Sequence, residues 1–114
     1  MRIRQFEIWI ANLEPRLGTE TGKVRPVLVV QTDLLNKVHP STLICPITSN
    51  VQEESEILRV NIKQGACNLK ESSDIMIDQI RAIDNRRFLV KVGKLPSALI
   101  TKVKENIKIL FDLL

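Results

Sequence analysis

Most of the chain consists of short apolar segments separated by polar turns, and this alternation limits the folds it can adopt. Six segments have the composition of β-strands: residues 6–13, 26–32, 42–48, 57–62, 74–83 and 87–92. Segments 26–32 and 42–48 are apolar at successive positions, which is typical of strands buried on both faces. Pro26 has no N–H to give a neighbouring strand, so it either begins its strand or lies at an edge. Pro46 indicates a bulge or an edge within its own strand.

The C-terminal part follows a different period. From Ser97 onward, apolar residues recur every three or four positions, at Leu99, Val103, Ile107, Leu110 and Leu114. This spacing predicts one amphipathic helix that begins near Pro96 and Ser97. Two short helical turns are also expected, at 33–36 and 67–71.

Short strands followed by a single terminal helix predict a mainly β fold, a small and strongly bent antiparallel barrel. At 114 residues, without repeats or linkers, the chain forms one domain spanning 1–114. Several strands carry apolar residues on both faces, more than one small barrel interior needs. Either a homodimer or a packed helix would cover the outer face.

Composition sets further bounds. The 17 basic and 13 acidic residues are interspersed and give a net charge of +4, compatible with a polyanionic partner but common without one. Cys45 and Cys67 lack metal-site spacing, and two reduced thiols fit better than a disulfide. No segment reaches the ~18 apolar residues of a membrane span. Glu7 interrupts the apolar core that a signal peptide would need. We therefore expect a cytoplasmic protein with no membrane association.

The chain lacks the residues of most familiar active sites. Its single histidine, His39, precedes a proline in a loop-like segment. There is no HExxH, Walker loop or GxGxxG pattern, and Ser72, Ser73 and Asp74 have no histidine with which to form a hydrolase triad. We expect neither a metal nor a cofactor. Any chemistry must come from arginine, threonine and backbone groups.

Two residues offer such chemistry, Arg25 at a loop–strand junction and Thr48 at a strand end. A guanidinium group matches phosphate oxygens with paired donors, and a threonine hydroxyl can donate one more hydrogen bond. RNA carries its own nucleophile, the 2′-hydroxyl, so an enzyme needs mainly to align it and stabilise the reacting phosphate. From spacing alone, a purely structural role for Arg25 and Thr48 stays open.

Three motifs in order resemble the MazF/PemK family of toxins. Gly18, Thr19, Glu20, Gly22, Arg25 and Pro26 match its G-[ST]-E-x-G-x-x-R-P loop; Pro46, Ile47, Thr48 and Ser49 match P-[LI]-T-S; Asp78, Gln79, Ile80 and Arg81 match D/E-Q-I/V-R. The closing segment VGKLPSALITKVKENI is similar to the family's last strand and helix. The resemblance covers nearly the whole chain.

The resemblance implies an SH3-like β-barrel that forms homodimers and cleaves single-stranded RNA at short sequences without a metal ion. Products would carry a 2′,3′-cyclic phosphate and a 5′-hydroxyl. By motif match, Arg25 would stabilise charge at the phosphate and Thr48 would hold a phosphate oxygen. Glu20 would act as an acid/base partner or read a base, and Gln79 would read a base. Thr19 and Ser49 would bind RNA or support the acid/base chemistry. Asp78 would brace the loop. A cognate antitoxin with a disordered, acidic and apolar tail would bind the dimer groove.

Two departures from the family pattern concern the choice of RNA sequence. The chain has Phe6-Glu7 where the family commonly has Gly-Asp. It also has Lys23, directly after Gly22, where the family has a further loop glycine. Two alternatives remain: a CcdB-like toxin that binds gyrase, and a non-catalytic SH3-like module for RNA or peptides. The ending KILFDLL lacks the Trp-Gly-Ile of the gyrase binders, which disfavours the former.

Overall fold

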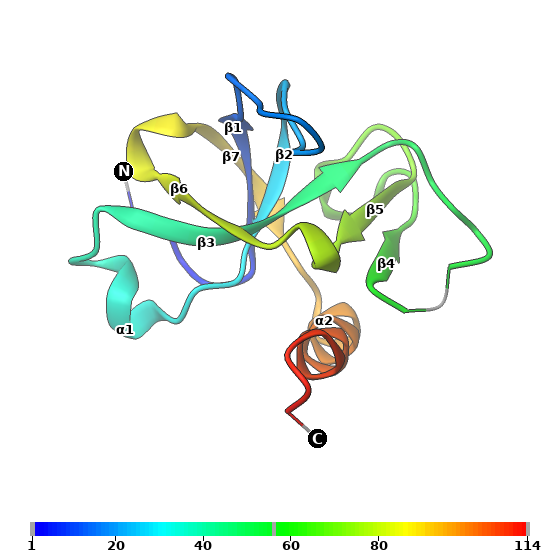
Figure 1. The fold of residues 1–114 in the computed structure, drawn as a ribbon. Coiled ribbons are helices and arrows are strands. Elements are labelled where there is room, and N and C mark those ends of the chain that lie inside the picture. The colour runs from blue at the N-terminus through cyan, green and yellow to red at the C-terminus, as the bar shows by residue number, and fades with distance from the viewer. Residues whose placement is uncertain (1, 56, 114) are drawn as a thin grey trace.

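The structure is a computed structural model that describes residues 2–55 and 57–113, a bent antiparallel sheet followed by a helix (Figure 1). The elements are β1 (Glu7–Asn12), β2 (Val24–Val29), α1 (Asp33–Asn36), β3 (Ser41–Thr48), β4 (Arg59–Ile62), η1 (Ala66–Asn68), β5 (Ser73–Met76), η2 (Ile77–Gln79), β6 (Arg81–Asp84), η3 (Asn85–Arg87), β7 (Phe88–Lys94) and α2 (Ser97–Leu110), where η is a 3-10 helix. The sheet order is β4-β5-β3-β2-β1-β7, and β6 also pairs with β3. The expected mainly β fold with a terminal helix is confirmed, as is the turn at 33–36. The turn expected at 67–71 overlaps η1 only in part.

The single strand expected at 74–83 is wrong, because the chain leaves the sheet at η2. Both β5 and β6 pair with the same edge of β3, through Ile47↔Ile75 and Ile44↔Arg81. Between these pairs β3 advances three residues while the opposite chain advances six. The 3-10 turn Ile77–Gln79 takes up the difference.

Both prolines lie where a ladder is interrupted. Pro46 pairs with Val27 of β2, but its other edge faces the gap between the β5 and β6 pairings. Pro26 does not begin its strand, which starts at Val24; the segment from Val24 to Pro26 pairs with β1 alone. The missing N–H groups therefore fall at an edge in both cases.

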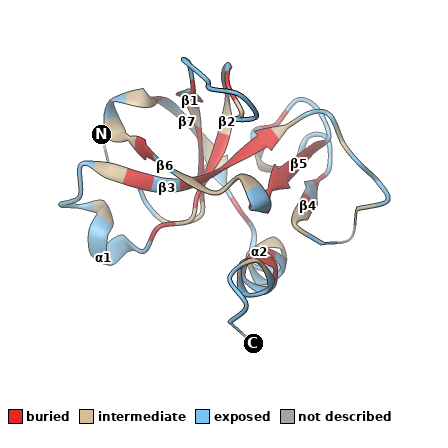
Figure 2. Ribbon diagram, in the orientation of Figure 1, coloured by how far each residue is buried: buried red, intermediate tan, exposed pale blue. Residues whose placement is uncertain are grey.

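Side chains from opposite faces of β1, β2 and β3 belong to two separate clusters of buried residues. Figure 2 shows buried stretches along these strands. Trp9, Val27 and Ile44 belong to a cluster closed by Phe88, whose ring meets Trp9 edge-on at 5.7 Å between centroids. The alternate residues of these strands pack in a second cluster, here called the outer core, that includes residues of β4, β5 and α2. Both faces of these three strands are thus covered by apolar side chains.

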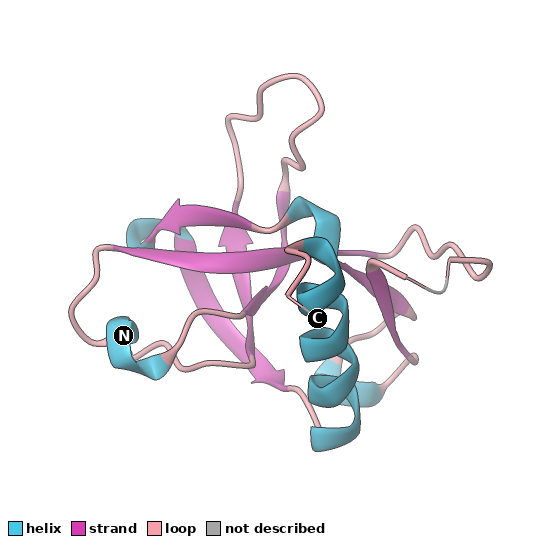
Figure 3. Ribbon diagram, turned by 60° about the horizontal axis from the view of Figure 1, so that its bottom comes forward, coloured by secondary structure: helices cyan, strands magenta, loops and turns pink. Residues whose placement is uncertain are grey.

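Helix α2 covers the outer core, one of the two solutions expected for the surplus apolar surface. Figure 3 shows the helix lying alongside the sheet. Val103 is fully buried there, and Leu99, Ile100, Ile107 and Leu110 pack around it. The polar face of the helix stays exposed. This packing holds β4 and β5 against the rest of the sheet.

The two family glycine positions that are occupied by other residues keep a left-handed backbone. Phe6 has φ = 65° and Lys23 has φ = 70°, a region that costs a residue with a Cβ about 1 kcal/mol or more. Phe6 packs its ring against the outer core. Lys23 is exposed, so burial does not offset the backbone strain there.

Candidate functional site

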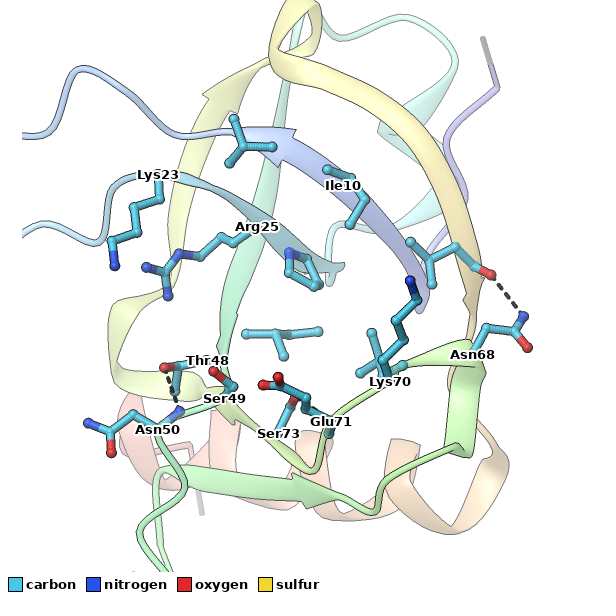
Figure 4. Close-up of a pocket in the computed structure, with 15 residues that line it drawn as sticks. Ile10, Lys23, Arg25, Thr48, Ser49, Asn50, Asn68, Lys70, Glu71 and Ser73 are labelled. Carbon is cyan, nitrogen blue, oxygen red and sulfur yellow. Dashed lines mark hydrogen bonds between the residues drawn. The ribbon is translucent and has the colours of Figure 1, made fainter.

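A groove of about 630 Å³ opens between the strand ends and the segment that connects η1 to β5 (Figure 4). Its walls come from β1, β2, β3 and β7 together with residues 68–73. Arg25, Thr48 and Ser49, three of the residues predicted from the sequence, line it together. The first two come from segments 23 positions apart in the chain. The pairing of β2 with β3 brings them to the same end of the sheet.

Arg25 is half-buried and directs its guanidinium group into the groove (Figure 4). Its Nε donates to the Gly22 carbonyl at 2.8 Å, which fixes the plane of the group. Its remaining N–H groups make no hydrogen bond or ion pair with any described residue. Burial lowers the pKa of Arg25, the charge of Arg16 lowers it further, and Glu14 opposes both. The result is a partly desolvated cation with donors free for an anion.

Thr48 faces Arg25 from the opposite wall (Figure 4). Its Oγ1 accepts a hydrogen bond from the Asn50 amide at 3.1 Å, which orients the hydroxyl and leaves its own hydrogen free to donate. Ser49 is exposed beside it. The wall therefore offers two hydroxyl groups to a ligand in the groove.

A buried carboxylate, Asp74, holds the segment after Thr48 in place. It pairs with Thr48 across β3 and β5 and accepts hydrogen bonds from the Gln52 amide at 2.9 Å, Asn61 Nδ2 at 3.1 Å and Arg59 Nη1 at 3.2 Å. Arg59 also donates to the Asn50 carbonyl at 3.0 Å. This network connects three segments beneath the groove wall.

The loop between β1 and β2 is braced by its own side chains. Glu14 accepts from the Lys23 amide at 2.6 Å and the Arg16 amide at 3.3 Å. Gly22 packs so closely here that an added Cβ would lie 2.5 Å from Glu14 Oε1. Arg81 donates to the Thr21 carbonyl at 3.3 Å. The third motif thus supports the first through Arg81, whereas Asp78, expected to brace the loop, is exposed and has no hydrogen bond among the described residues.

Three of the predicted site residues do not line the groove. Thr19 and Glu20 are exposed in the loop, where Glu20 Oε1 accepts from the Leu17 amide at 2.8 Å and closes a turn. Gln79 lies half-buried in η2. The groove proper therefore unites Arg25, Thr48 and Ser49.

Sequence reasoning missed several groove residues. Lys70 and Glu71 precede β5 in a loop without any motif, and Asn50 follows the second motif directly. Lys23, which stands at a loop glycine of the family, also lines the groove. The only available signal for Lys70 and Glu71 was a pair of charged residues just before a predicted strand.

No cluster of three or more His, Cys, Asp and Glu side chains suited to a metal ion occurs in the part of the chain that the structure describes. Across the same residues, no helix has the length and apolarity required to cross a bilayer. Cys45 and Cys67 are both free thiols.

Comparison with known proteins identifies the family and the fold of the chain. Residues 4–111 match the family described as PemK-like, MazF-like toxin of type II toxin-antitoxin system. The chain is 33% identical over 109 residues to Endoribonuclease EndoA of Bacillus subtilis (strain 168), covering 96% of this chain and 94% of that protein. The chain therefore belongs to the PemK-like and MazF-like toxins.

Two solved structures show the same fold at low sequence identity. MazF from Deinococcus radiodurans superimposes with a TM-score of 0.84 at 21% identity, over 98% of each chain. A mycobacterial endoribonuclease in complex with its cognate antitoxin has a TM-score of 0.80 at 12% identity, over 98% of this chain and 97% of that one. These matches confirm the SH3-like barrel with a C-terminal helix that the sequence motifs implied.

Proposed function

We propose that this toxin is an endoribonuclease that cleaves single-stranded RNA in the groove between Arg25 and Thr48. One observation carries the proposal: a guanidinium with unused donors and an oriented hydroxyl face each other across a groove of about 630 Å³. Membership of the toxin family and the relative named an endoribonuclease support the reaction class.

In the proposed reaction, the 2′-oxygen attacks the adjacent phosphorus and the bond from phosphorus to the 5′-oxygen breaks. The 2′-hydroxyl loses a proton, and the departing 5′-oxygen gains one, so a 2′,3′-cyclic phosphate and a 5′-hydroxyl result. Arg25 stabilises the charge on the pentavalent phosphate, since arginine stays protonated and is a poor proton donor. Thr48 donates to a non-bridging phosphate oxygen. This step needs no metal ion.

The other predicted residues take supporting roles in this proposal. Ser49 adds a second hydroxyl to the groove wall. Thr19 and Glu20 contact the RNA from the loop beyond the groove, where Glu20 serves as acid/base partner or reads a base. Gln79 offers a donor and an acceptor to an unstacked base from η2.

We also propose a homodimer that meets a cognate antitoxin in the cytoplasm. The solved complex of a mycobacterial endoribonuclease with its antitoxin has the same fold as this chain. The groove is lined by aliphatic residues that include Ile10, Ile47 and Val92 and by the cations Lys23, Arg25 and Lys70, which suits a tail with acidic and apolar residues. Sedimentation of the purified chain should give twice the 13.0 kDa mass of one protomer.

The test is cleavage of several long, weakly structured RNAs in EDTA, with mapping of the 5′ ends of the products. Discrete fragments with 5′-hydroxyl ends are expected, and Arg25→Ala or Thr48→Ala should slow cleavage by ~100-fold or more. Arg86→Ala and Thr101→Ala, which alter exposed residues outside the groove, serve as matched controls. If every RNA survived, or if the controls lost as much activity as the groove variants, the proposal would fail. The binding-module and gyrase alternatives would then return.

A further inference from the structure

Among the described residues that line the groove, one carries a carboxylate, and this group has no partner within the described part of the chain. Lys23, Arg25 and Lys70 supply positive charge, and Glu71 supplies the negative charge. Figure 4 shows Glu71 on the wall that carries Thr48 and Ser49, across from Arg25. Within the described residues, the Glu71 carboxylate makes no hydrogen bond and no ion pair.

A free carboxylate is unfavourable in a groove that holds a polyanion, because it repels the phosphates. Its two oxygens accept hydrogen bonds and donate none when ionised. The 2′-hydroxyl can donate a hydrogen bond to a carboxylate, but it is the same in every nucleotide. The donors that differ between bases are the amino hydrogens on base edges. Cytosine, adenine and guanine each present such a donor, whereas uracil presents carbonyl oxygens on both sides of a single N–H.

We infer that Glu71 is a specificity-determining residue that selects an amino-bearing base next to the cleaved bond and disfavours uracil at that position. The inference rests on the proposed function, because it assigns one base preference to the same groove. Lys70, its neighbour in the chain, carries the opposite charge and points into the same groove (Figure 4). An ammonium group contacts phosphates without regard to sequence.

Glu71 and Lys70, neighbours of opposite charge in the same groove, provide a matched pair of variants. Wild type, Glu71→Gln and Lys70→Gln would each cleave a random-sequence RNA pool, and sequencing of product ends would give the base preference at every position. Wild type should show one position depleted of uracil. Glu71→Gln, whose amide both donates and accepts, should lose that depletion and cut the preferred sites about 10-fold more slowly. Lys70→Gln should weaken cleavage at all sites alike and reduce its salt dependence.

A second measurement separates this inference from the proposed function. Oligonucleotides with 2′-O-methyl groups cannot be cut and report binding alone. Four of them would differ only at the selected position, or at each position in turn if no cleavage occurs. Weaker binding of the uracil version by wild type, equalised in Glu71→Gln, supports the inference even if cleavage fails. Equal tightening of all four by Glu71→Gln would show that Glu71 merely repels phosphate, and would overturn it.

Discussion

The network around Asp74 gives a quantitative prediction for the variant Asp74→Ala. The Asp74 side chain is 3% exposed and its partner Arg59 is 18% exposed. Removing the carboxylate takes this acceptor from the Arg59 cation and the Gln52 amide, whereas Asn61 Nδ2 keeps the Ser73 carbonyl at 3.2 Å. Breaking a buried ion pair costs about 3–5 kcal/mol, and the lower end applies here because Arg59 keeps the Asn50 carbonyl and some water.

We therefore expect Asp74→Ala to lower the free energy of unfolding by about 3 kcal/mol and the melting temperature by about 12 °C. Urea unfolding followed by circular dichroism measures the first quantity, and calorimetry the second. Asp84→Ala is the matched control, because Asp84 pairs with Arg86 at 2.9 Å but the two side chains are 44% and 90% exposed. Water screens that pair, so its loss should matter far less.

Two results would refute this reasoning about burial. One is a loss of less than about 1 kcal/mol in Asp74→Ala, the net value of a single ordinary hydrogen bond. The other is an equal loss in both variants. A folded Asp74→Ala protein should also cleave RNA more slowly at a temperature well below its melting point, since the segment after Thr48 is no longer held.

Three further predictions follow from single residues. Lys23→Gly should stabilise the protein by about 1 kcal/mol in urea unfolding, whereas Lys23→Ala, which keeps the strained φ of 70°, should not. Burial raises the pKa of the Glu7 carboxyl, but hydrogen bonds, led by that from Lys91, outweigh burial and lower the pKa below 4.5. The charge of Glu7 therefore stabilises the fold above pH 4.5. This contribution is lost as the pH falls through the lowered pKa, so the stability difference between wild type and Glu7→Gln should shrink in acid. Burial raises the pKa of both thiols, that of Cys45 to about 12, but Cys45 is buried and Cys67 only half-buried. A thiol reagent at neutral pH should therefore modify Cys67 in the native protein and reach Cys45 only after unfolding.

Local sequence patterns predicted the elements whose causes are local. The helix at Ser97–Leu110 follows from the spacing of its apolar residues, and most strands were identified within a few positions of their ends. The break at Ile77–Gln79 was missed because Asp78 disfavours a strand only weakly when apolar residues flank it on both sides. It arises from the pairing of two segments with one edge of β3, which is a property of the whole sheet.

The candidate site also divides into residues that local motifs predicted and residues that only the tertiary fold brings together. Arg25 and Thr48 lie together in the groove, and the motif spacing had singled out both. Glu20 belongs to the same motif, yet its carboxylate closes a turn at Leu17, a contact that depends on the conformation of the loop. Lys70 and Glu71 carry no local pattern at all, and only the tertiary fold brings them to the groove.

Pro46 has a consequence for the chain before it folds. Residues 41–49, STLICPITS, contain no charge and are rich in β-branched and aliphatic side chains, a composition that favours intermolecular β-aggregation. The native sheet tolerates a missing donor at Pro46 because that edge of β3 faces the gap between β5 and β6. In an unfolded chain the same missing donor interrupts any stack of identical strands. Pro46 therefore acts as a gatekeeper against self-assembly of the strand that joins the two halves of the sheet.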